Sequence, residues 1–243
     1  MISRPSNFHR LILFGVFAFL LLPAAQAQPW VSFETHSRYL ALGDSISAGY
    51  GAIPATQGFV HQLYQSGAID NINNTLFCNM GVPNAVSKDV LDYQVPQVKR
   101  FFSVTGQPYR KVITLTVGGN DMMQVLGGAD PNVVLPAFGA NLFAILSTLT
   151  TEFPDARIYV ANYCDPRPPV PNEKLLVMGL NQVIGGVVAA FPGSVTLVDV
   201  FTAFEGRNGL LLIERKGGDP FQIHPTNAGY RVMADLFASA IRQ

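Results

Sequence analysis

The feature that most constrains this chain is a regular alternation of short apolar segments with segments whose apolar residues recur at helical spacing. Strands joined by helices favour a parallel sheet, because right-handed crossovers place helices on both of its faces. The pattern therefore predicts an α/β fold, a three-layer α/β/α sandwich around a five-stranded parallel sheet. The expected strands are 38–42, 75–79, 111–117, 157–161 and 194–200.

The segments between these strands are expected to be helical over 59–64, 87–93, 138–153 and 171–191, with a last helix after Thr226. Apolar residues at three- and four-residue spacing predict the buried faces of two of these helices. Those residues are Leu142, Ile145, Leu146 and Leu149 in one, and Met233, Leu236, Phe237, Ala240 and Ile241 in the other. Residues 202–222 are the least regular, and Asn208-Gly209 is expected to turn a small hairpin.

The first 27 residues are expected to be a leader rather than part of the fold. Two arginines precede an apolar run at 11–22, and the residues at 25–27 (AQA) form a small-x-small cleavage signal. We therefore expect a signal peptide over 1–27, a mature domain over 28–243, and a secreted or periplasmic location. The run is short of the roughly 20 apolar residues that span a membrane. No later segment is expected to span one, so no permanent membrane anchor is expected.

Length and charge narrow the classes of protein further. The mature 216 residues (243 − 27) suffice for one sizeable core but are short for two ordinary domains. Its formal charge, 14 − 16 = −2, offers no clustered basic surface, so nucleic acid is not an expected partner. Two cysteines in an exported protein invite pairing. Cys78 and Cys164 lie near the ends of strands placed well apart, however, and unpaired thiols are favoured.

Polar residues gather where the predicted strands end. In an open parallel sheet, ligands bind outside the carboxyl ends of the strands, and four blocks converge on that edge. The blocks are Gly43-Asp44-Ser45, Asn79-Met80-Gly81, Gly118-Gly119-Asn120-Asp121, and Asp219 to His224.

Ser45 is the candidate nucleophile, since a strand-to-helix turn favours negative charge through its backbone N–H groups and the helix dipole. The plain alternative is an N-cap serine. A serine hydroxyl needs a base, and four histidines are present. His9 lies in the leader, His36 precedes the first strand at its wrong end, and His61 lies within a helix. His224 remains as the candidate base.

An oxyanion hole is expected from Asn120, through its side-chain amide, and from Gly81, through its backbone N–H. The plain alternatives are a turn residue after two glycines and an ordinary glycine after a strand. We expect Asp44 to hold the loop and Asp121 to be structural. Nucleotide-binding loops and zinc motifs are absent from the sequence, so neither a cofactor nor a metal is expected.

These blocks together resemble the SGNH (GDSL-like) hydrolases, in that family's order and spacing, over nearly the whole mature chain. The matching residues are Gly43-Asp44-Ser45-Ile46, Asn79-Met80-Gly81, Gly118-Gly119-Asn120-Asp121 and His224-Pro225. The resemblance implies a flavodoxin-like sheet and cofactor-free hydrolysis of an ester or thioester through an acyl-enzyme. It also implies an oxyanion hole made by the N–H groups of Ser45 and Gly81 and the side chain of Asn120.

Two positions depart from that family's pattern. Its aspartate usually stands three residues before the histidine, where this chain has Phe221. The nearest acid is Asp219, five residues before the histidine, and it is the predicted third member of the triad. Asp199, at the end of the fifth strand, and a main-chain carbonyl remain alternatives. The second block also has Asn84 where a glycine is common.

The expected function is a secreted serine hydrolase that cleaves carboxylic esters of small molecules or lipids. Two alternatives use the same scaffold: a carbohydrate O-deacetylase or acyltransferase, and an inactive secreted protein that binds glycan or lipid. Four apolar residues after the third block are candidates for an acyl pocket, although core packing explains them equally well. They are Met122, Met123, Val125 and Leu126.

Overall fold

A computed structural model describes residues 36–103, 109–165, 171–212 and 224–243. The expected signal peptide, 1–27, and the predicted triad acid, Asp219, lie outside the described residues. The chain divides into two units, Met1–Ser32 and Phe33–Gln243, and every described residue belongs to the second.

The described part of the chain is built on five parallel strands in the order β2-β1-β3-β4-β5. They are β1 (Ser37–Gly43), β2 (Thr75–Asn79), β3 (Arg110–Thr116), β4 (Ala156–Ala161) and β5 (Val195–Val198). All five expected strands are confirmed, with ends that differ by at most two residues. In this order β2 and β3 flank β1, so the chain changes direction there, and such a point is where parallel sheets bind ligands.

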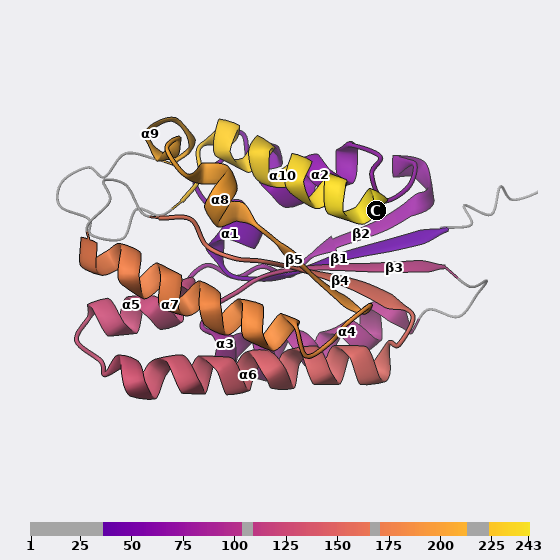
Figure 1. Cartoon of the computed structure of the whole chain (residues 1–243). Coiled ribbons are helices and arrows are strands. Elements are labelled where there is room, and N and C mark those ends of the chain that lie inside the picture. Colours follow the sequence, from indigo (N-terminus) through magenta and orange to yellow (C-terminus); the bar gives the residue numbers. More distant parts are fainter. Residues whose placement is uncertain (1–35, 104–108, 166–170, 213–223) are drawn as a thin grey trace, which may run out of the picture. The chain divides into compact units, whose positions relative to one another are not determined.

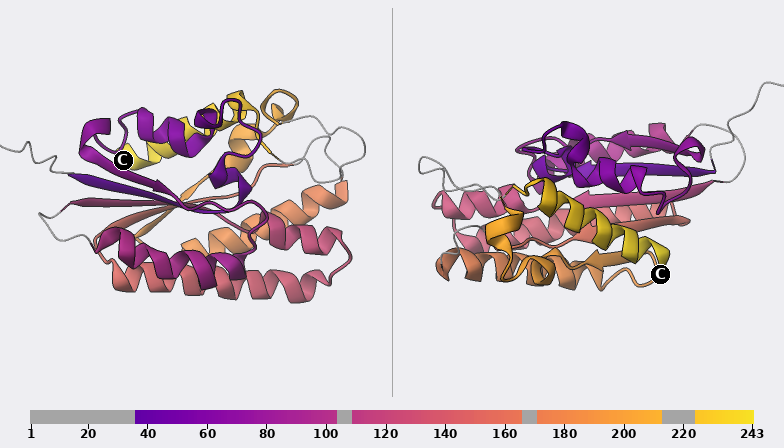
Figure 2. Two further views of the ribbon diagram at one scale, coloured as in Figure 1. Left: turned by 180° about the vertical axis from the view of Figure 1, so that it is seen from behind. Right: turned by 90° about the horizontal axis from the view of Figure 1, so that it is seen from above.

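Helices cover both faces of the sheet and complete the three layers (Figures 1 and 2). One face carries α1 (Ser45–Ala48), α2 (Phe59–Gln65), α8 (Val200–Phe204), α9 (Asn208–Leu211) and α10 (Asn227–Arg242). The other carries α3 (Ser87–Asp89), η3 (Val90–Gln94), α4 (Val95–Phe102), α5 (Gly119–Leu126), α6 (Pro131–Glu152) and α7 (Pro171–Val188). The short turns η1 (Ala55–Gln57) and η2 (Ile72–Asn74) flank α2.

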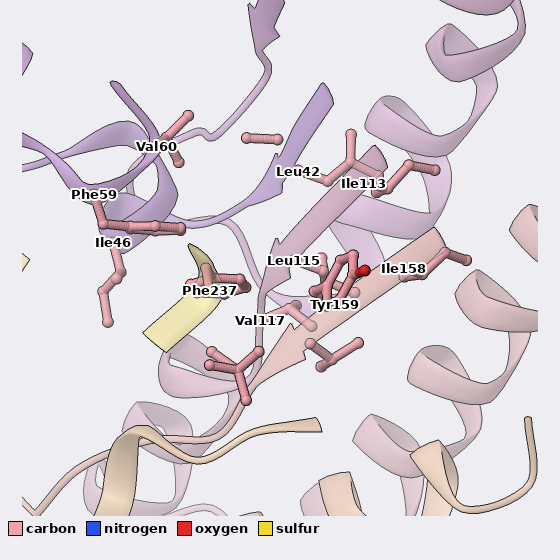
Figure 3. Packing of buried hydrophobic residues seen from close by; sticks show 14 of the residues in the cluster. Leu42, Ile46, Phe59, Val60, Ile113, Leu115, Val117, Ile158, Tyr159 and Phe237 are labelled. Carbon is pink, nitrogen blue, oxygen red and sulfur yellow. The ribbon is translucent and has the colours of Figure 1, made fainter. Parts of the chain in front are cut away.

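The hydrophobic core lies on both sides of β1, whose seven residues are all buried. Above the sheet, Phe59 of α2 stacks on Phe237 of α10 with ring centroids 4.9 Å apart (Figure 3). Below it, the predicted inner face of α6 is fully buried. In α10, Met233, Phe237 and Ile241 are buried as expected, whereas Leu236 and Ala240 are partly exposed. Each fully buried side chain of this size contributes about 1.5–3 kcal/mol.

Several helix boundaries differ from the expected ones because caps lie outside the periodic segments. α6 begins at Pro131 rather than 138, since Asp130 accepts a hydrogen bond from Asn132 N at 2.9 Å. The helix expected over 87–93 continues through η3 and α4 to Phe102, and α5 was not expected.

The hairpin predicted at Asn208-Gly209 is wrong, because these residues begin helix α9. The Asn208 side chain donates to Asp165 O at 2.6 Å, and Leu211 is buried. One helical turn places Leu211 in the core, and that burial outweighs the local preference of Asn-Gly for a turn.

The expectation that no later segment is long and apolar enough to cross a membrane is also wrong, because α6 meets both criteria. It has 22 residues and a mean hydropathy of 1.7 over its most apolar window. Its inner face is buried, and it packs against α7, α5 and α3 in the same layer. This packing accounts for an apolar helix in the layer.

Cys78 and Cys164 are both free, as expected. Cys78 lies in β2, whereas Cys164 follows β4, and two strands separate β2 from β4.

Candidate active site

Ser45 is the first residue of α1 and follows β1 after a single intervening residue, Asp44. The N-cap is Asp44, whose Oδ1 accepts from Ile46 N at 3.0 Å. The alternative role of Ser45 as the cap is therefore wrong. Gly43 makes the tight turn possible, since its φ is 128° and an added Cβ would lie 1.9 Å from Thr116 O.

The structure brings the predicted nucleophile and base together. His224 Nε2 lies 2.8 Å from Ser45 Oγ, although 179 positions separate them in the sequence. This is the separation at which a general base takes a hydroxyl proton. The Tyr50 ring lies against the His224 ring, with centroids 4.6 Å apart. His224 directly precedes Pro225, which bridges to Leu212 and thereby fixes the approach to α10.

The two other expected oxyanion donors lie at the same edge. Asn120 is in the first turn of α5, and its Nδ2 donates to Ala85 O at 2.8 Å. A primary amide carries two N–H donors, and Ala85 accepts from one of them. The bond fixes the orientation of the Asn120 side chain.

Gly81 lies directly against the helix that begins at Ser45. An added Cβ would be 2.5 Å from Ala48 N, so only glycine fits this approach. The Gly81 N–H donates to Asn79 Oδ1 at 3.0 Å, and Asn79 Nδ2 donates to Ser47 O at 2.7 Å. Asn79 therefore fastens the second block to α1 and occupies the Gly81 N–H.

Asp44 holds the loop, as expected, and it does so from a buried position. Its Oδ1 accepts from Thr116 Oγ1 at 2.9 Å, and its Oδ2 accepts a short hydrogen bond from the Tyr163 hydroxyl. Burial raises the pKa of Asp44 to about 6, although the hydrogen bonds from Tyr163, Thr116 and Ile46 oppose this rise. Burial and the adjacent Asp44 carboxylate also raise the pKa of Tyr163.

Sequence reasoning missed two residues that support the nucleophile. Tyr163 follows β4 and therefore lies at the same edge of the sheet as the four blocks. That position after a strand is the one feature of the sequence that indicates a role for Tyr163 at the site. Gln94 brackets Gly43: its Oε1 accepts from Gly43 N at 2.7 Å, and its Nε2 donates to Gly43 O at 2.8 Å. Nothing in the local sequence around Gln94 indicates this contact.

Asp121 and Asn84 have structural explanations. Asp121 accepts from Ser87 N at 2.9 Å and from Ser87 Oγ at 2.6 Å, which ties α3 to α5. Burial raises its pKa. Asn84 has φ 68° and is the one non-glycine residue at positive φ among the residues that the structure describes. Asparagine tolerates this conformation, so the departure from glycine preserves the backbone.

The third triad member stays a prediction, because Asp219 is not among the described residues. The alternative, Asp199, caps α8 by accepting from Thr202 N at 3.1 Å and from Asn162 Nδ2 at 2.9 Å. Partial burial raises the pKa of Asp199, but these hydrogen bonds outweigh it and leave the pKa below its usual value. Asp199 therefore has a structural task of its own.

Within the described ranges, no group of three or more His, Cys, Asp or Glu side chains could hold a metal ion. The candidate acyl-pocket residues lie in α5, and Met122 among them is a core residue that is 2% exposed.

A parallel sheet of this strand order, with a serine and a histidine in contact at its switch point, defines a hydrolase fold of the SGNH type. The chain belongs to the GDSL-like Lipase/Acylhydrolase family, whose description matches residues 41–232.

Known relatives are similar over most of this chain. The spore germination lipase LipC of Bacillus licheniformis is 25% identical over 221 residues, which cover 84% of this chain and 95% of that protein. The phospholipase A1 structure from Streptomyces albidoflavus has a TM-score of 0.62 at 19% identity, covering 84% of this chain and 99% of that one. The structure of a catalytic mutant of an acetylxylan esterase from Geobacillus stearothermophilus has a TM-score of 0.61 at 17% identity, covering 85% of this chain and 94% of that one. At these identities the structural likeness shows the fold.

Proposed function

We propose that this protein is a secreted carboxylic ester hydrolase that works through an acyl-enzyme on Ser45. The observation that carries the proposal is the 2.8 Å contact between Ser45 Oγ and His224 Nε2. Capping of α1 by Asp44 leaves the Ser45 hydroxyl for that contact. Names of relatives with the same fold, a lipase, a phospholipase and an acetylxylan esterase, support ester cleavage as the reaction class.

In the first half of the reaction, Ser45 Oγ attacks the ester carbonyl carbon while His224 Nε2 takes the hydroxyl proton. The resulting oxyanion collapses, the bond to the alcohol oxygen breaks, and His224 gives its proton to the leaving alcohol. In the second half, His224 takes a proton from water, which attacks the acyl group on Ser45. The acid leaves, and the proton returns from His224 to Ser45 Oγ.

The oxyanion is stabilised by donors that the fold holds in place. Ser45 N–H lies at the start of α1, and the Asn120 amide is oriented through Ala85. Gly81 N–H is the third donor and exchanges Asn79 Oδ1 for the oxyanion. Each such donor supplies about 3–4 kcal/mol of transition-state stabilisation. Asp219 is assigned to orient His224.

Labelling with a fluorophosphonate probe tests this proposal, because the probe reacts with an activated serine. The wild-type protein should be labelled at Ser45, and Ser45→Ala should take no label. Ser239→Ala is the matched control, since Ser239 is exposed on α10. Labelling of Ser45→Ala at the wild-type rate, or ester hydrolysis by it within tenfold of wild type, removes the central assignment. An inactive glycan- or lipid-binding protein would leave Ser45 unlabelled.

Secretion has a separate test. When the whole chain is expressed in a bacterium with a periplasm, the product should leave the cytoplasm and begin at Gln28. N-terminal mass spectrometry of the exported protein checks this. Full-length protein that stays in the cytoplasm contradicts the leader assignment.

A further inference from the structure

A pocket of about 220 Å³ begins one residue after Gly81, and the mechanism above makes no use of it. It lies between the loop that follows β2 and the helical segment formed by α3 and η3. Its lining residues are Val82, Pro83, Asn84, Ala85, Asp89, Tyr93 and Gln94.

Four hydrogen bonds fasten the walls of this pocket to the candidate active site. Val82 N donates to Gly43 O at 2.9 Å, and Gln94 bonds both backbone polar groups of Gly43, two residues before Ser45. On the other side, Ala85 O accepts from Asn120 Nδ2. The pocket therefore adjoins the position that an ester carbonyl would occupy.

The lining of the pocket is mostly apolar, and two of its polar side chains are bonded to the backbone. Gln94 uses both ends of its amide on Gly43, and Asp89 Oδ2 accepts from Val86 N at 3.1 Å. Val82 and Tyr93 stand at the rim and are 50% and 71% exposed. Large exposed apolar side chains beside a pocket are typical of a binding groove for an apolar ligand.

We propose that this pocket binds the acyl chain of the substrate and selects aliphatic chains of about six to eight carbons. The inference rests on the proposed function. The leaving oxygen must lie beside His224 to take its proton, which leaves the acyl chain for the side of Gly81 and Ala85. At about 30 Å³ for each water-sized group, the pocket holds roughly seven such groups. An acetyl group would leave it almost empty, so the pocket favours a lipase-like substrate over an acetylated sugar.

The test is a series of p-nitrophenyl esters from acetate to dodecanoate. For the wild-type protein, kcat/KM should peak at hexanoate or octanoate, at least tenfold above acetate. Val82→Asp places a carboxylate at the pocket and should lower the octanoate-to-acetate ratio of kcat/KM at least tenfold. Ile72→Asp is the matched control, because Ile72 is 41% exposed and precedes β2 at the opposite end of the sheet. It should leave the ratio within twofold.

Tyr93→Ala provides a second variant that removes one wall, and the expected cost to folding is small because Tyr93 is mostly exposed. It should lower the same ratio at least threefold. A wild-type optimum at acetate overturns the proposal, as does a ratio that neither Val82→Asp nor Tyr93→Ala changes while Ser45 still takes the fluorophosphonate. An altered preference for the alcohol portion of acetate esters, with the acyl preference unchanged, assigns the pocket to the alcohol and also overturns it. Failure of the proposed function gives a different result, no label on Ser45 and no hydrolysis of any ester.

Discussion

Two polar clusters lie at the carboxyl edge of this sheet, and they use their side chains differently. At the ends of β4 and β5, Asn162 Oδ1 accepts from Val200 N and Phe201 N, while its Nδ2 donates to Asp199. The first two of these hydrogen bonds satisfy backbone N–H groups in the first turn of helix α8. At the end of β1, Asp44 performs the capping, and the Ser45 hydroxyl is directed to His224. A polar residue at this edge is thus a candidate for catalysis only where a neighbour satisfies the helix end.

The largest expected difference between the two clusters is in kcat. Ser45→Ala, His224→Ala and the double variant should each lose about 10⁶-fold in kcat, because the two residues act as a unit. Asn162→Ala should lose thermal stability but keep kcat within threefold for the folded fraction. Ester hydrolysis and thermal unfolding monitored on the same samples check both. Losses that multiply in the double variant would show that Ser45 and His224 act independently.

The two candidate acids, Asp219 and Asp199, should also differ in how much their replacement lowers kcat. Asp219→Asn should lower kcat by about two to four orders of magnitude, since an orienting carboxylate fixes the tautomer of the histidine. Asp199→Asn should change kcat little and instead weaken the cap of α8, at a cost of about 0.5–2 kcal/mol. The opposite ranking in steady-state kinetics would move the triad acid to Asp199. If neither loss exceeds about fivefold, a main-chain carbonyl orients His224.

Asn120→Ala should lower kcat by about 10²- to 10³-fold with KM nearly unchanged, because an oxyanion donor acts mainly in the transition state. The matched change is Asn208→Ala, which removes an amide that donates to Asp165 O at the far end of the edge. It should leave kcat near the wild-type value. A rise in KM at constant kcat for Asn120→Ala would make Asn120 a residue that binds the ground state.

The smallest expected effect is on stability. The folded-state pKa of Asp44, about 6, lies above its ordinary value of 3.8, so the native state binds more protons than the unfolded state between these pH values. The free energy of unfolding should therefore fall as pH rises from about 4 to 6, by up to about 3 kcal/mol from this group. Asp44→Asn should remove that fall. Urea unfolding at pH 4 to 7 measures it, and identical slopes in both proteins would contradict the raised pKa.

The sequence by itself determined the alternation that produces five parallel strands, because hydrophobic periodicity is a local property. It also determined the four blocks, since the ends of parallel strands share one edge whatever the details of packing. The sequence therefore predicts that Ser45, Gly81, Asn120 and His224 all lie at that edge.

Only the tertiary structure decided which atoms meet there. The bond from Tyr163 to Asp44 joins positions 119 residues apart, and the clasp of Gln94 on Gly43 joins positions 51 apart. Neither has a local pattern, because each depends on how helices pack across the sheet. The same holds for α9, which forms to bury Leu211. Local spacing fixes periodic structure, whereas contacts between distant segments are fixed by packing and by the need to satisfy buried polar groups.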